Sequence, residues 1–284
     1  MSVSVVLTTY GRAELLPGTI ESILDQTFRD FELIISDDCS PDGTEAVCRT
    51  IAGRDHRVRY RRNEVRLGMP GNLNAALREA RGDLVANLHD GDLYDRRLLE
   101  RWRNALVACQ DAAFVFNAYR HLAADGAVSG TTRERLPSCF PGRVLLEDVY
   151  FRRRRFDSPV WGTVMARRSK YQAVGLFAER FGFQSDVDMW MRLAEDSCVA
   201  YVDEPLITLP SRDAAPRLVS LTSTEEARKV RRMFWEARMR HYRRNPVRRA
   251  LEASRHAVFT VNAIAVERAL VARRRMGWRT SSPH

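Results

Sequence analysis

The sequence contains no hydrophobic run long enough to cross a membrane. Its longest apolar stretch, residues 257–266, is interrupted by Thr260 and Asn262. That stretch is far shorter than the roughly 20 residues that a membrane-spanning helix requires. The first residues also lack the basic start and the small-residue cleavage site of a signal peptide. We therefore expect a cytoplasmic protein without a membrane span.

Cysteine is scarce and scattered. The five cysteines form no Cys-x-x-Cys pair, which argues against a disulfide framework and a zinc site and fits a reducing compartment. The sequence also lacks a Gly-x-x-x-x-Gly-Lys phosphate loop and a Gly-x-Ser-x-Gly nucleophile elbow. P-loop nucleotide hydrolysis and serine-hydrolase chemistry are therefore not indicated.

Negative charge is scarce only near the end of the sequence. Residues 225–284 hold 16 Lys and Arg but 5 Asp and Glu, a charge of +11, whereas the whole chain carries +10. The preceding 224 residues are nearly neutral, with 30 basic and 31 acidic groups. An anionic macromolecule or membrane would therefore have to bind this last segment.

The basic segment is predicted to form amphipathic helices that are separated at Pro246. One helix would carry Met233, Phe234 and Trp235 among arginines, a combination that suits peripheral contact with the inner face of an anionic membrane. The alternative is a helix packed on the rest of the protein with a solvated basic face. The sequence leaves both interpretations open.

Strands alternate with helices over the first 110 residues. Apolar, β-branched runs predict strands over 3–8, 31–36, 57–61 and 83–88, and helical periodicity lies between them, for example over 69–80. This alternation is typical of βαβ units and predicts an α/β protein with a mostly parallel sheet.

Three of these strands end in polar clusters: Thr8-Thr9-Tyr10, Asp37-Asp38 and Asp90-Gly91-Asp92. Because ligands of parallel sheets bind beyond the carboxyl ends of the strands, we expect the clusters to converge on one crevice. The alternative is that Asp and Gly merely terminate strands.

The regular alternation of strands and helices becomes less clear from Ala113 onward. We expect a strand over 114–116, a hairpin turn at Asp125-Gly126, a loop over 129–160, a strand over 160–166 and a helix over 185–194. These changes predict three parts: residues 1–112, residues 113–224 and the basic helical extension 225–284.

The tripeptide Asp90-Gly91-Asp92 is the strongest chemical signal. Carboxylates at i and i+2 on extended backbone point the same way, and the glycine between them allows a ligand to approach closely. Oxygen ligands on one side, with open positions on the other, suit Mg²⁺ or Mn²⁺ held jointly by the protein and a phosphate group.

Several segments, taken in order, resemble family 2 glycosyltransferases, an inverting family with the GT-A fold. The resemblance covers roughly residues 1–210 and implies a Rossmann-like domain with a mostly parallel sheet flanked by helices. It implies that residues 1–112 bind a nucleotide-sugar donor and that residues 113–224 bind the acceptor. The segments that carry it are Val5–Arg12, Gln26–Leu33, Ser36–Thr44, Ala80–Asp83, His89–Tyr94 and Ser185–Leu193.

The resemblance implies that Thr8, Tyr10 and Asp38 hold the nucleoside of the donor. Such roles suit the residue types, because a carboxylate can accept a hydrogen bond from a pyrimidine N–H and a tyrosine ring can stack on a base. Asp37 is expected instead to orient the loop that follows it.

The resemblance also places Asp90 and Asp92 at the family's metal site, with Asp90 close to the donor. A divalent cation there would stabilise the negative charge that grows on the departing nucleoside diphosphate. Arg12, Arg62 and Arg66 are candidates to assist, with a solvated surface role as the alternative for each.

Asp186 is the predicted catalytic base, because it matches the position of an acidic residue at the family's acceptor site. The alternatives are that Asp188 is the base or that Asp186 caps the helix. Trp190 is either an acceptor platform or a core residue. Many relatives carry a histidine after this helix, but residues 209–213 contain none, which leaves Arg212 as a possible contact to the diphosphate and a weaker metal dependence open.

The sequence therefore predicts an inverting transferase that moves a sugar from a nucleoside diphosphate donor, UDP or dTDP favoured, to a hydroxyl of a glycan, a lipid-linked saccharide or a metabolite. A nucleotidyltransferase would require a glycine-rich basic loop after the first strand, which is lacking. A basic nucleic-acid module would leave the acidic crevice unexplained, so no nucleic-acid partner is expected. A homo-oligomer is compatible with the sequence.

Overall fold

The computed structural model describes residues 1–151, 160, 162–210 and 224–254. Its strands form one ten-stranded sheet. Their bounds are β1 (Val3–Thr9), β2 (Phe31–Asp37), β3 (Val58–Arg62), β4 (Leu84–His89), β5 (Leu93–Tyr94), β6 (Ala112–Leu122), β7 (Val128–Thr132), β8 (Cys139–Pro141), β9 (Val164–Arg167) and β10 (Cys198–Leu209).

The strands follow the order β3-β2-β1-β4-β9-β6-β10-β5, with β7 paired to β6 and β8 to β10. The pairs among β1, β2, β3 and β4 are parallel, and so is the pair of β6 with β10. Strand β9 runs antiparallel between β4 and β6. The mostly parallel sheet that the sequence predicted is confirmed.

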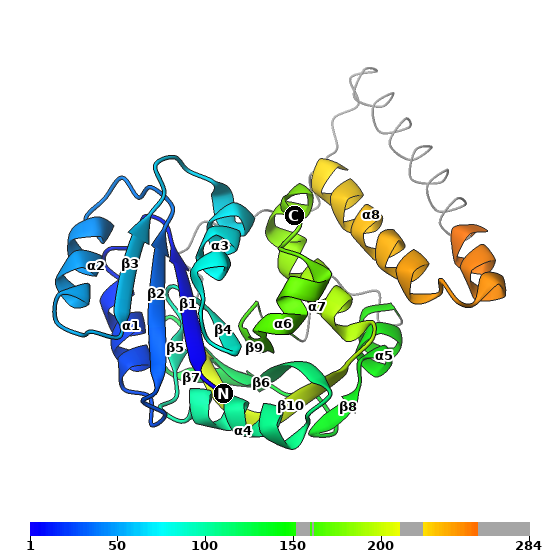
Figure 1. Cartoon of the computed structure of the whole chain (residues 1–284), viewed down its shortest axis with the longest axis horizontal. Helices are drawn as coiled ribbons and strands as arrows, with labels where there is room; N and C mark the ends of the chain where they lie inside the picture. Colours follow the sequence, from blue (N-terminus) through cyan, green and yellow to red (C-terminus); the bar gives the residue numbers. More distant parts are fainter. Residues whose placement is uncertain (152–159, 161, 211–223, 255–284) are drawn as a thin grey trace, which may run out of the picture. The chain divides into compact units, whose positions relative to one another are not determined.

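Helices connect most of the strands (Figure 1). Their bounds are α1 (Leu16–Leu24), α2 (Thr44–Ala52), α3 (Gly68–Glu79), α4 (Leu98–Ala108), α5 (Gly142–Val144), α6 (Arg168–Val174), α7 (Ser185–Ala194) and α8 (Thr224–His241), with a π-helix η1 (Leu145–Phe151) and a 3₁₀ helix η2 (Glu179–Gln184).

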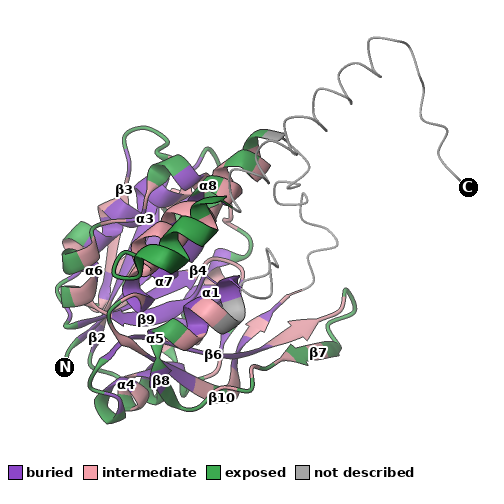
Figure 2. Ribbon diagram, turned by 90° about the vertical axis from the view of Figure 1, so that its right-hand side faces the viewer, coloured by how far each residue is buried: buried purple, intermediate pink, exposed green. Residues whose placement is uncertain are grey.

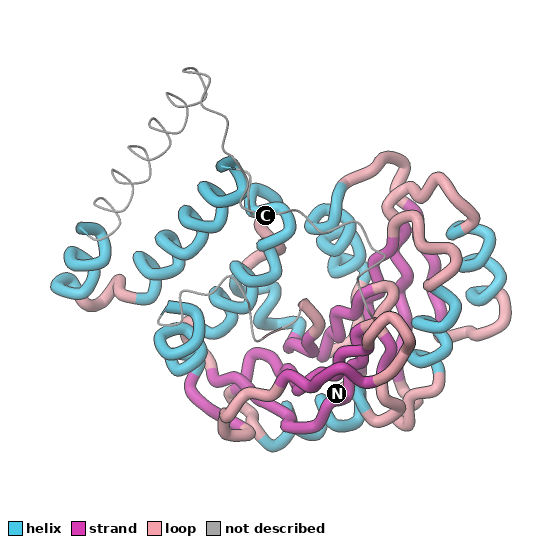
Figure 3. Tube along the Cα trace, turned by 180° about the vertical axis from the view of Figure 1, so that it is seen from behind, coloured by secondary structure: helices cyan, strands magenta, loops and turns pink. Residues whose placement is uncertain are grey.

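Helices cover both faces of the sheet, with α1 and α2 on one side of β1–β3 and α3 on the other (Figures 1 and 3). On the α1 side, Val5 and Leu7 of β1 share a core with Ile20 of α1 and Trp102 of α4. Because both faces are covered, β1 is buried along nearly its whole length, as its continuous apolar run predicted. Figure 2 shows the same for β9, which is coloured as buried.

The predicted loop over 129–160 is wrong over much of its length. Strand β7 completes the hairpin whose turn was expected at Asp125-Gly126, and β8 pairs with β10. Residues 142–151 are helical. Strands of three to five residues are too short to show the alternation of apolar and polar residues that identifies a strand in a sequence. Strands β7 and β8 therefore form because of the strands that they pair with, and their own sequence pattern does not reveal them.

A disulfide joins Cys109 and Cys139, whose Cα atoms are 5.8 Å apart, a bond that the scattered cysteines did not predict. Cys109 ends α4 and Cys139 begins β8, and 30 residues separate them. Only the pairing of β8 with β10 brings the two together, which no local spacing rule reveals.

The chain divides into two compact units, of which the first spans Met1–Val230 and the second begins at Arg231. Within the second unit, helical structure stops after His241 and resumes at Pro246, as predicted. Arg238 and Glu252 form an ion pair at 3.6 Å across this break. Among the described residues, no helix is both long and apolar enough to cross a membrane.

Candidate active site

The polar clusters that follow three adjacent strands lie at one edge of the sheet. Thr8 on β1 is in register with Ser36 on β2 and with His89 on β4. Asp37-Asp38 and Asp90-Gly91-Asp92 come directly after these two partners. Because the three strands are parallel, their carboxyl ends meet at the same edge, and the clusters form one site.

Asp38 is buried beside the loop that leads into α3. Its Oδ1 accepts hydrogen bonds from the Leu67 amide at 2.8 Å and from Asn63 Nδ2 at 2.9 Å. Its Oδ2 accepts one from the Gly68 amide at 2.9 Å. A carboxylate offers about four acceptor positions, so about one remains on Oδ2 for a ligand. Asp38 thus shapes the loop and retains some capacity to bind a base N–H.

Asp37, by contrast, is fully occupied by the protein. It accepts hydrogen bonds from the amide and hydroxyl of Ser40, from the Tyr60 hydroxyl at 2.8 Å and from Arg62 Nη1 at 2.9 Å. Arg62 also lies 3.5 Å from Glu45. Arg62 is therefore held in a structural ion pair, and Asp37 orients the loop as expected.

Tyr10 and Arg66 stack on each other at the end of β1. The guanidinium carbon of Arg66 lies 3.8 Å from the centroid of the Tyr10 ring, and 36% of Tyr10 is exposed. Thr8, two residues earlier on the strand, is half-buried. The structure thus brings together two residues that the sequence assigned to the donor and leaves an aromatic surface open to a ligand.

The turn Asp90-Gly91-Asp92 is fastened to α1. Thr19 Oγ1 accepts a hydrogen bond from the Gly91 amide at 3.0 Å and donates one to the Asp92 carbonyl at 3.0 Å. Gly91 has φ +86°, a conformation that favours glycine. One hydroxyl on α1 therefore sets the direction of both flanking aspartates.

Asp90 lies beside Arg12 and is half-buried. Burial raises the pKa of Asp90, while the nearby Thr9 hydroxyl, the charge of Arg12 and the Tyr10 amide partly offset that rise. Asp92 is more deeply buried, with 4% of its surface exposed. A cation next to these carboxylates would relieve the cost of burying negative charge.

The donor set of this turn fits Mg²⁺ or Mn²⁺ bound together with a phosphate. No group of three or more His, Cys, Asp and Glu side chains suited to a metal occurs in the part of the chain that the structure describes. Mg²⁺ sites, however, commonly use one or two carboxylates and complete their octahedral shell with substrate phosphates and water. Asp90 and Asp92 are the two carboxylates that this turn would offer to such an ion.

Asp186 is the second residue of α7. The residue that caps this helix is Gln184, without a side-chain capping bond, so the alternative of Asp186 as the cap is wrong. Asp186 Oδ1 accepts a hydrogen bond from the Val187 amide at 2.7 Å. Burial raises the pKa of Asp186 to about 6, although the backbone amides of Val187 and Asp186 lower it. A carboxylate with this pKa is suited to accept a proton near neutral pH.

Asp188 and Trp190 belong to the interior of the protein. Asp188 is 1% exposed and pairs with Arg192 at 2.8 Å. Arg192 also donates to the carbonyls of Val174 and Leu176, after α6. Trp190 is buried with ring centroids 5.7 Å from those of Phe114 and Phe177. Trp190 is therefore a core residue, and Asp188 serves the packing of α7.

Two residues without a role predicted from the sequence, His89 and Gly162, lie beside Asp186. A Cβ atom on Gly162 would lie 2.4 Å from His89 Cε1, 2.8 Å from His89 Nε2 and 3.0 Å from Asp186 Oδ2. His89 and Asp186 therefore share the space above Gly162. No sequence signal announces this contact, because the three residues come from three separate segments. Arg212, the other candidate contact to the diphosphate, lies outside the described residues.

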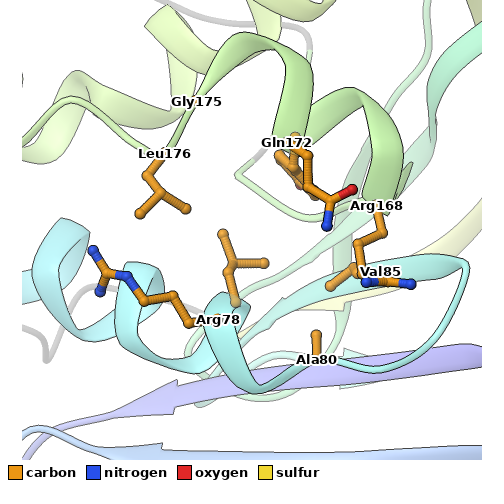
Figure 4. A pocket seen from close by; sticks show the side chains of 9 residues that line it. Arg78, Ala80, Val85, Arg168, Gln172, Gly175 and Leu176 are labelled. Atoms are coloured by element: carbon orange, nitrogen blue, oxygen red, sulfur yellow. The ribbon is translucent and has the colours of Figure 1, made fainter.

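A cavity of about 270 Å³ lies between α3 and α6, away from this edge (Figure 4). Its lining includes Arg78, Val85, Arg168, Gln172 and Leu176. Val85 is at the start of β4, whereas Asp90 follows the end of that strand. The cavity therefore contains none of the residues that the sequence assigned to the site.

Comparisons with known proteins find similarity to glycosyltransferases. The model of the family described as Glycosyl transferase family 2 matches residues 4–169. EpsE of Bacillus subtilis (strain 168), provisionally named a glycosyltransferase, is 29% identical over 209 residues, which are 70% of this chain and 69% of EpsE. The GalNAc(5)-diNAcBac-PP-undecaprenol beta-1,3-glucosyltransferase of Campylobacter jejuni is 40% identical over 90 residues. These are 31% of this chain and 29% of that enzyme.

Solved structures with low sequence identity share the fold. S. aureus TarS 1–349 in complex with UDP has a TM-score of 0.66 at 17% identity, over 84% of this chain and 66% of that one. The mannosyltransferase PcManGT from Pyrobaculum calidifontis, in complex with GDP-Man and Mn²⁺, has a TM-score of 0.57 at 18% identity. The matched region covers 95% of this chain and 79% of the PcManGT chain.

Proposed function

We propose the following function for this chain, which belongs to glycosyl transferase family 2. It transfers one sugar from a nucleoside diphosphate donor, a UDP- or dTDP-sugar favoured, to a hydroxyl of a glycan, a lipid-linked saccharide or a metabolite. The observation that carries this proposal is the convergence, at one sheet edge, of the Tyr10–Arg66 stack, the Asp90-Gly91-Asp92 turn and the ends of β1, β2 and β4.

In this proposal the nucleoside binds over the ends of β1 and β2. Tyr10 offers its exposed ring to the base, with Arg66 stacked on it, and the remaining acceptor position of Asp38 receives a base N–H. Thr8 lines the strand end below. The complex of TarS with UDP supports a uridine nucleotide as the first donor to test.

Asp90 and Asp92 would hold a divalent cation, Mg²⁺ or Mn²⁺, on the donor diphosphate. When bound, such an ion stabilises negative charge on the departing nucleoside diphosphate. Arg12, which already lies beside Asp90, adds a second positive charge at this end of the site. The complex of PcManGT with GDP-Man and Mn²⁺ supports the same assignment.

Asp186 would act as the general base through its Oδ2 atom, since Oδ1 is held by the Val187 amide. The acceptor hydroxyl gives its proton to Asp186 while its oxygen forms a bond to the anomeric carbon. The bond from that carbon to the phosphate oxygen breaks, and the nucleoside diphosphate leaves with the electron pair. Attack opposite to the leaving group inverts the configuration of the anomeric carbon.

A lipid-linked saccharide is the first acceptor to test. The name of the C. jejuni relative includes an undecaprenol-linked saccharide, which supports a lipid-linked acceptor. We propose that the chain binds such an acceptor at the cytoplasmic face of the membrane. The basic segment 225–284 would then provide peripheral membrane contact. The chain covers only 29% of that relative, so the acceptor has to be tested directly.

Calorimetry of donor binding tests the proposal most directly. We would titrate UDP, dTDP and GDP, with and without Mn²⁺, into the wild type and the Asp92→Asn variant. Binding of one nucleotide that tightens at least tenfold with Mn²⁺ in the wild type alone supports the transferase. If no nucleotide binds to a folded sample, and a polyanion binds with steep salt dependence instead, the chain is a basic binding module.

A further inference from the structure

Gly162 brings a histidine and the proposed base into one small space. The nearest atoms to a Cβ on Gly162 would be His89 Cε1 at 2.4 Å, His89 Nε2 at 2.8 Å and Asp186 Oδ2 at 3.0 Å. Real Cβ atoms do not approach other atoms as closely as 2.4 Å. The absence of a side chain at position 162 is therefore what allows the imidazole to lie next to the carboxylate.

The backbone of His89 is held firmly. The Tyr94 hydroxyl accepts a hydrogen bond from the His89 amide at 2.9 Å and donates one to the His89 carbonyl at 2.9 Å. Tyr94 itself is buried and belongs to β5, which pairs with β10. Asn87 Nδ2, two residues before His89, donates to the Gly162 carbonyl at 2.8 Å. His89 and Gly162 are thus fixed to each other through the sheet.

The two oxygens of Asp186 have different surroundings. Oδ1 accepts the Val187 amide at 2.7 Å, which anchors one side of the carboxylate to its own helix. Oδ2 lies on the side of Gly162 and His89. A carboxylate that is anchored on one oxygen can still rotate unless its other side is blocked, and the imidazole is the group placed to block it.

We propose that His89 is a positioning residue, which packs on Gly162 and keeps Asp186 Oδ2 turned toward the acceptor hydroxyl. This inference rests on the proposed function, since Asp186 must be the base. Its physical basis is that displacing a reacting group by about 1 Å can cost on the order of 10²-fold in rate. His89 would affect the rate without binding the donor or the metal.

A thermal double-variant cycle tests the contact without any substrate. We would compare Gly162→Ala, His89→Ala and the double variant with the wild type. The new methyl group must displace the ring in the wild-type background but finds space when the ring is removed. The double variant should therefore melt above the temperature that the two single shifts predict, by roughly 2 °C or more. Additive shifts would overturn the proposal.

A kinetic cycle tests the positioning role. His89→Ala and Gly162→Ala should each lower kcat by roughly 10- to 100-fold, and the double variant should be no slower than the slower single variant. The KM for the donor and the calorimetric affinity for UDP with Mn²⁺ should stay within twofold. His89→Gln, which retains a planar hydrogen-bonding group, should recover part of the rate.

His121→Ala is the matched control, since His121 is a partly buried histidine that contacts Thr132 at 2.9 Å on the β6–β7 hairpin. It should retain the wild-type kcat. If the wild type neither transfers sugar nor binds any nucleotide, the proposed function fails while the thermal cycle still decides the contact. If the wild type is active and His89→Ala is equally fast, the positioning role is wrong and the function stands.

Discussion

Asp186 is half-buried, and its partial withdrawal from water has two opposing consequences. It raises the pKa of the carboxyl to about 6, which makes the carboxylate a stronger proton acceptor than an exposed aspartate. It also makes the ionised form less favourable in the folded protein than in the unfolded chain, where the pKa is near 3.8. A residue that only supported the fold would not be expected to carry such a cost.

The first prediction concerns Asp186→Asn, which removes the charge and keeps an oxygen for the Val187 amide. We expect kcat to fall by about 10²- to 10⁴-fold. We also expect the variant to unfold at a higher temperature than the wild type at pH 7.5, by a gain of at most roughly 3 kcal/mol, because the buried charge is gone. Below about pH 3, where Asp186 is protonated in both the folded and the unfolded state, the gain should vanish. A variant that is less stable than the wild type at pH 7.5 would contradict this assignment.

The second prediction concerns the pH dependence of transfer. A base must be ionised to accept a proton, so kcat should fall as the pH drops through about 6, toward a tenfold loss per pH unit below it. Initial rates between pH 5 and 8 would measure this limb, with UDP affinity measured over the same range as the control. A rate that stays constant down to pH 5 would exclude Asp186 as the base.

At the scale of elements, short polar contacts attach the site to the helices around it. Thr19 ties the Asp90-Gly91-Asp92 turn to α1, and Asp188 with Arg192 ties α7 to the segment after α6. Asn74 of α3 holds the backbone of Phe177 through two hydrogen bonds, at 2.9 and 3.0 Å. The geometry of the site therefore depends on how these helices are fixed to one another.

The third prediction tests the α1 contact with Thr19→Val, which preserves shape and removes the hydroxyl. The Gly91 amide loses its acceptor, so we expect about 1–3 kcal/mol lower stability and roughly tenfold weaker UDP binding with Mn²⁺. Thr50→Val is the control, since the Thr50 hydroxyl donates a hydrogen bond to the Ala46 carbonyl within its own helix, α2, away from the turn. Equal UDP affinities for the two variants would show that Thr19 does not shape the turn.

The fourth prediction separates the two aspartates of α7. Asp188→Ala breaks a buried ion pair and should lower the free energy of unfolding by about 3 kcal/mol, while UDP binding to the remaining folded protein persists. Asp25→Ala, which removes the exposed partner of Arg29, should cost no more than about 0.5 kcal/mol. Denaturant unfolding measures both. An Asp188→Ala protein that is fully stable but inactive would favour Asp188 as the base.

At the scale of the whole molecule, charge is divided along the chain. The acidic site belongs to the nearly neutral first 224 residues, and the excess positive charge lies in residues 225–284. Arg248 and Arg249 are exposed in the second unit. A transferase with a lipid-linked acceptor would benefit from such a segment, because each basic residue near an anionic surface contributes about 1 kcal/mol.

The fifth prediction follows from that distribution. Peripheral membrane contact predicts that the full chain sediments with vesicles containing phosphatidylglycerol, is released at high salt, and ignores pure phosphatidylcholine vesicles. The Arg248→Glu/Arg249→Glu variant should bind more weakly, whereas Arg54→Glu, in the first unit, should not change binding. Failure to sediment with anionic vesicles would favour the alternative of a solvated basic face.

Much of the donor half was predictable because its signals are local. The continuous apolar runs at β1, β2 and β4, the helical periodicity over 69–80 and the polar residues at strand ends all depend on neighbours within a few positions. Parallel pairing then follows from the βαβ order, and it brings the strand ends together. The sequence by itself therefore determined the α/β class and the edge of the sheet where the candidate site lies.

Only the tertiary structure decided what depends on contacts between distant segments. The resemblance already favoured Asp186 as the base, but the spacing of the two acids left Asp188 open as an alternative. Only the structure shows Asp188 buried in an ion pair with Arg192, which supports the choice of Asp186. Trp190 is buried by Phe114 and Phe177, and Cys109 meets Cys139 through β8. The approach of His89 to Asp186 requires a residue without a side chain at position 162, which is Gly162. Such packing between distant segments produces no periodic pattern in the sequence.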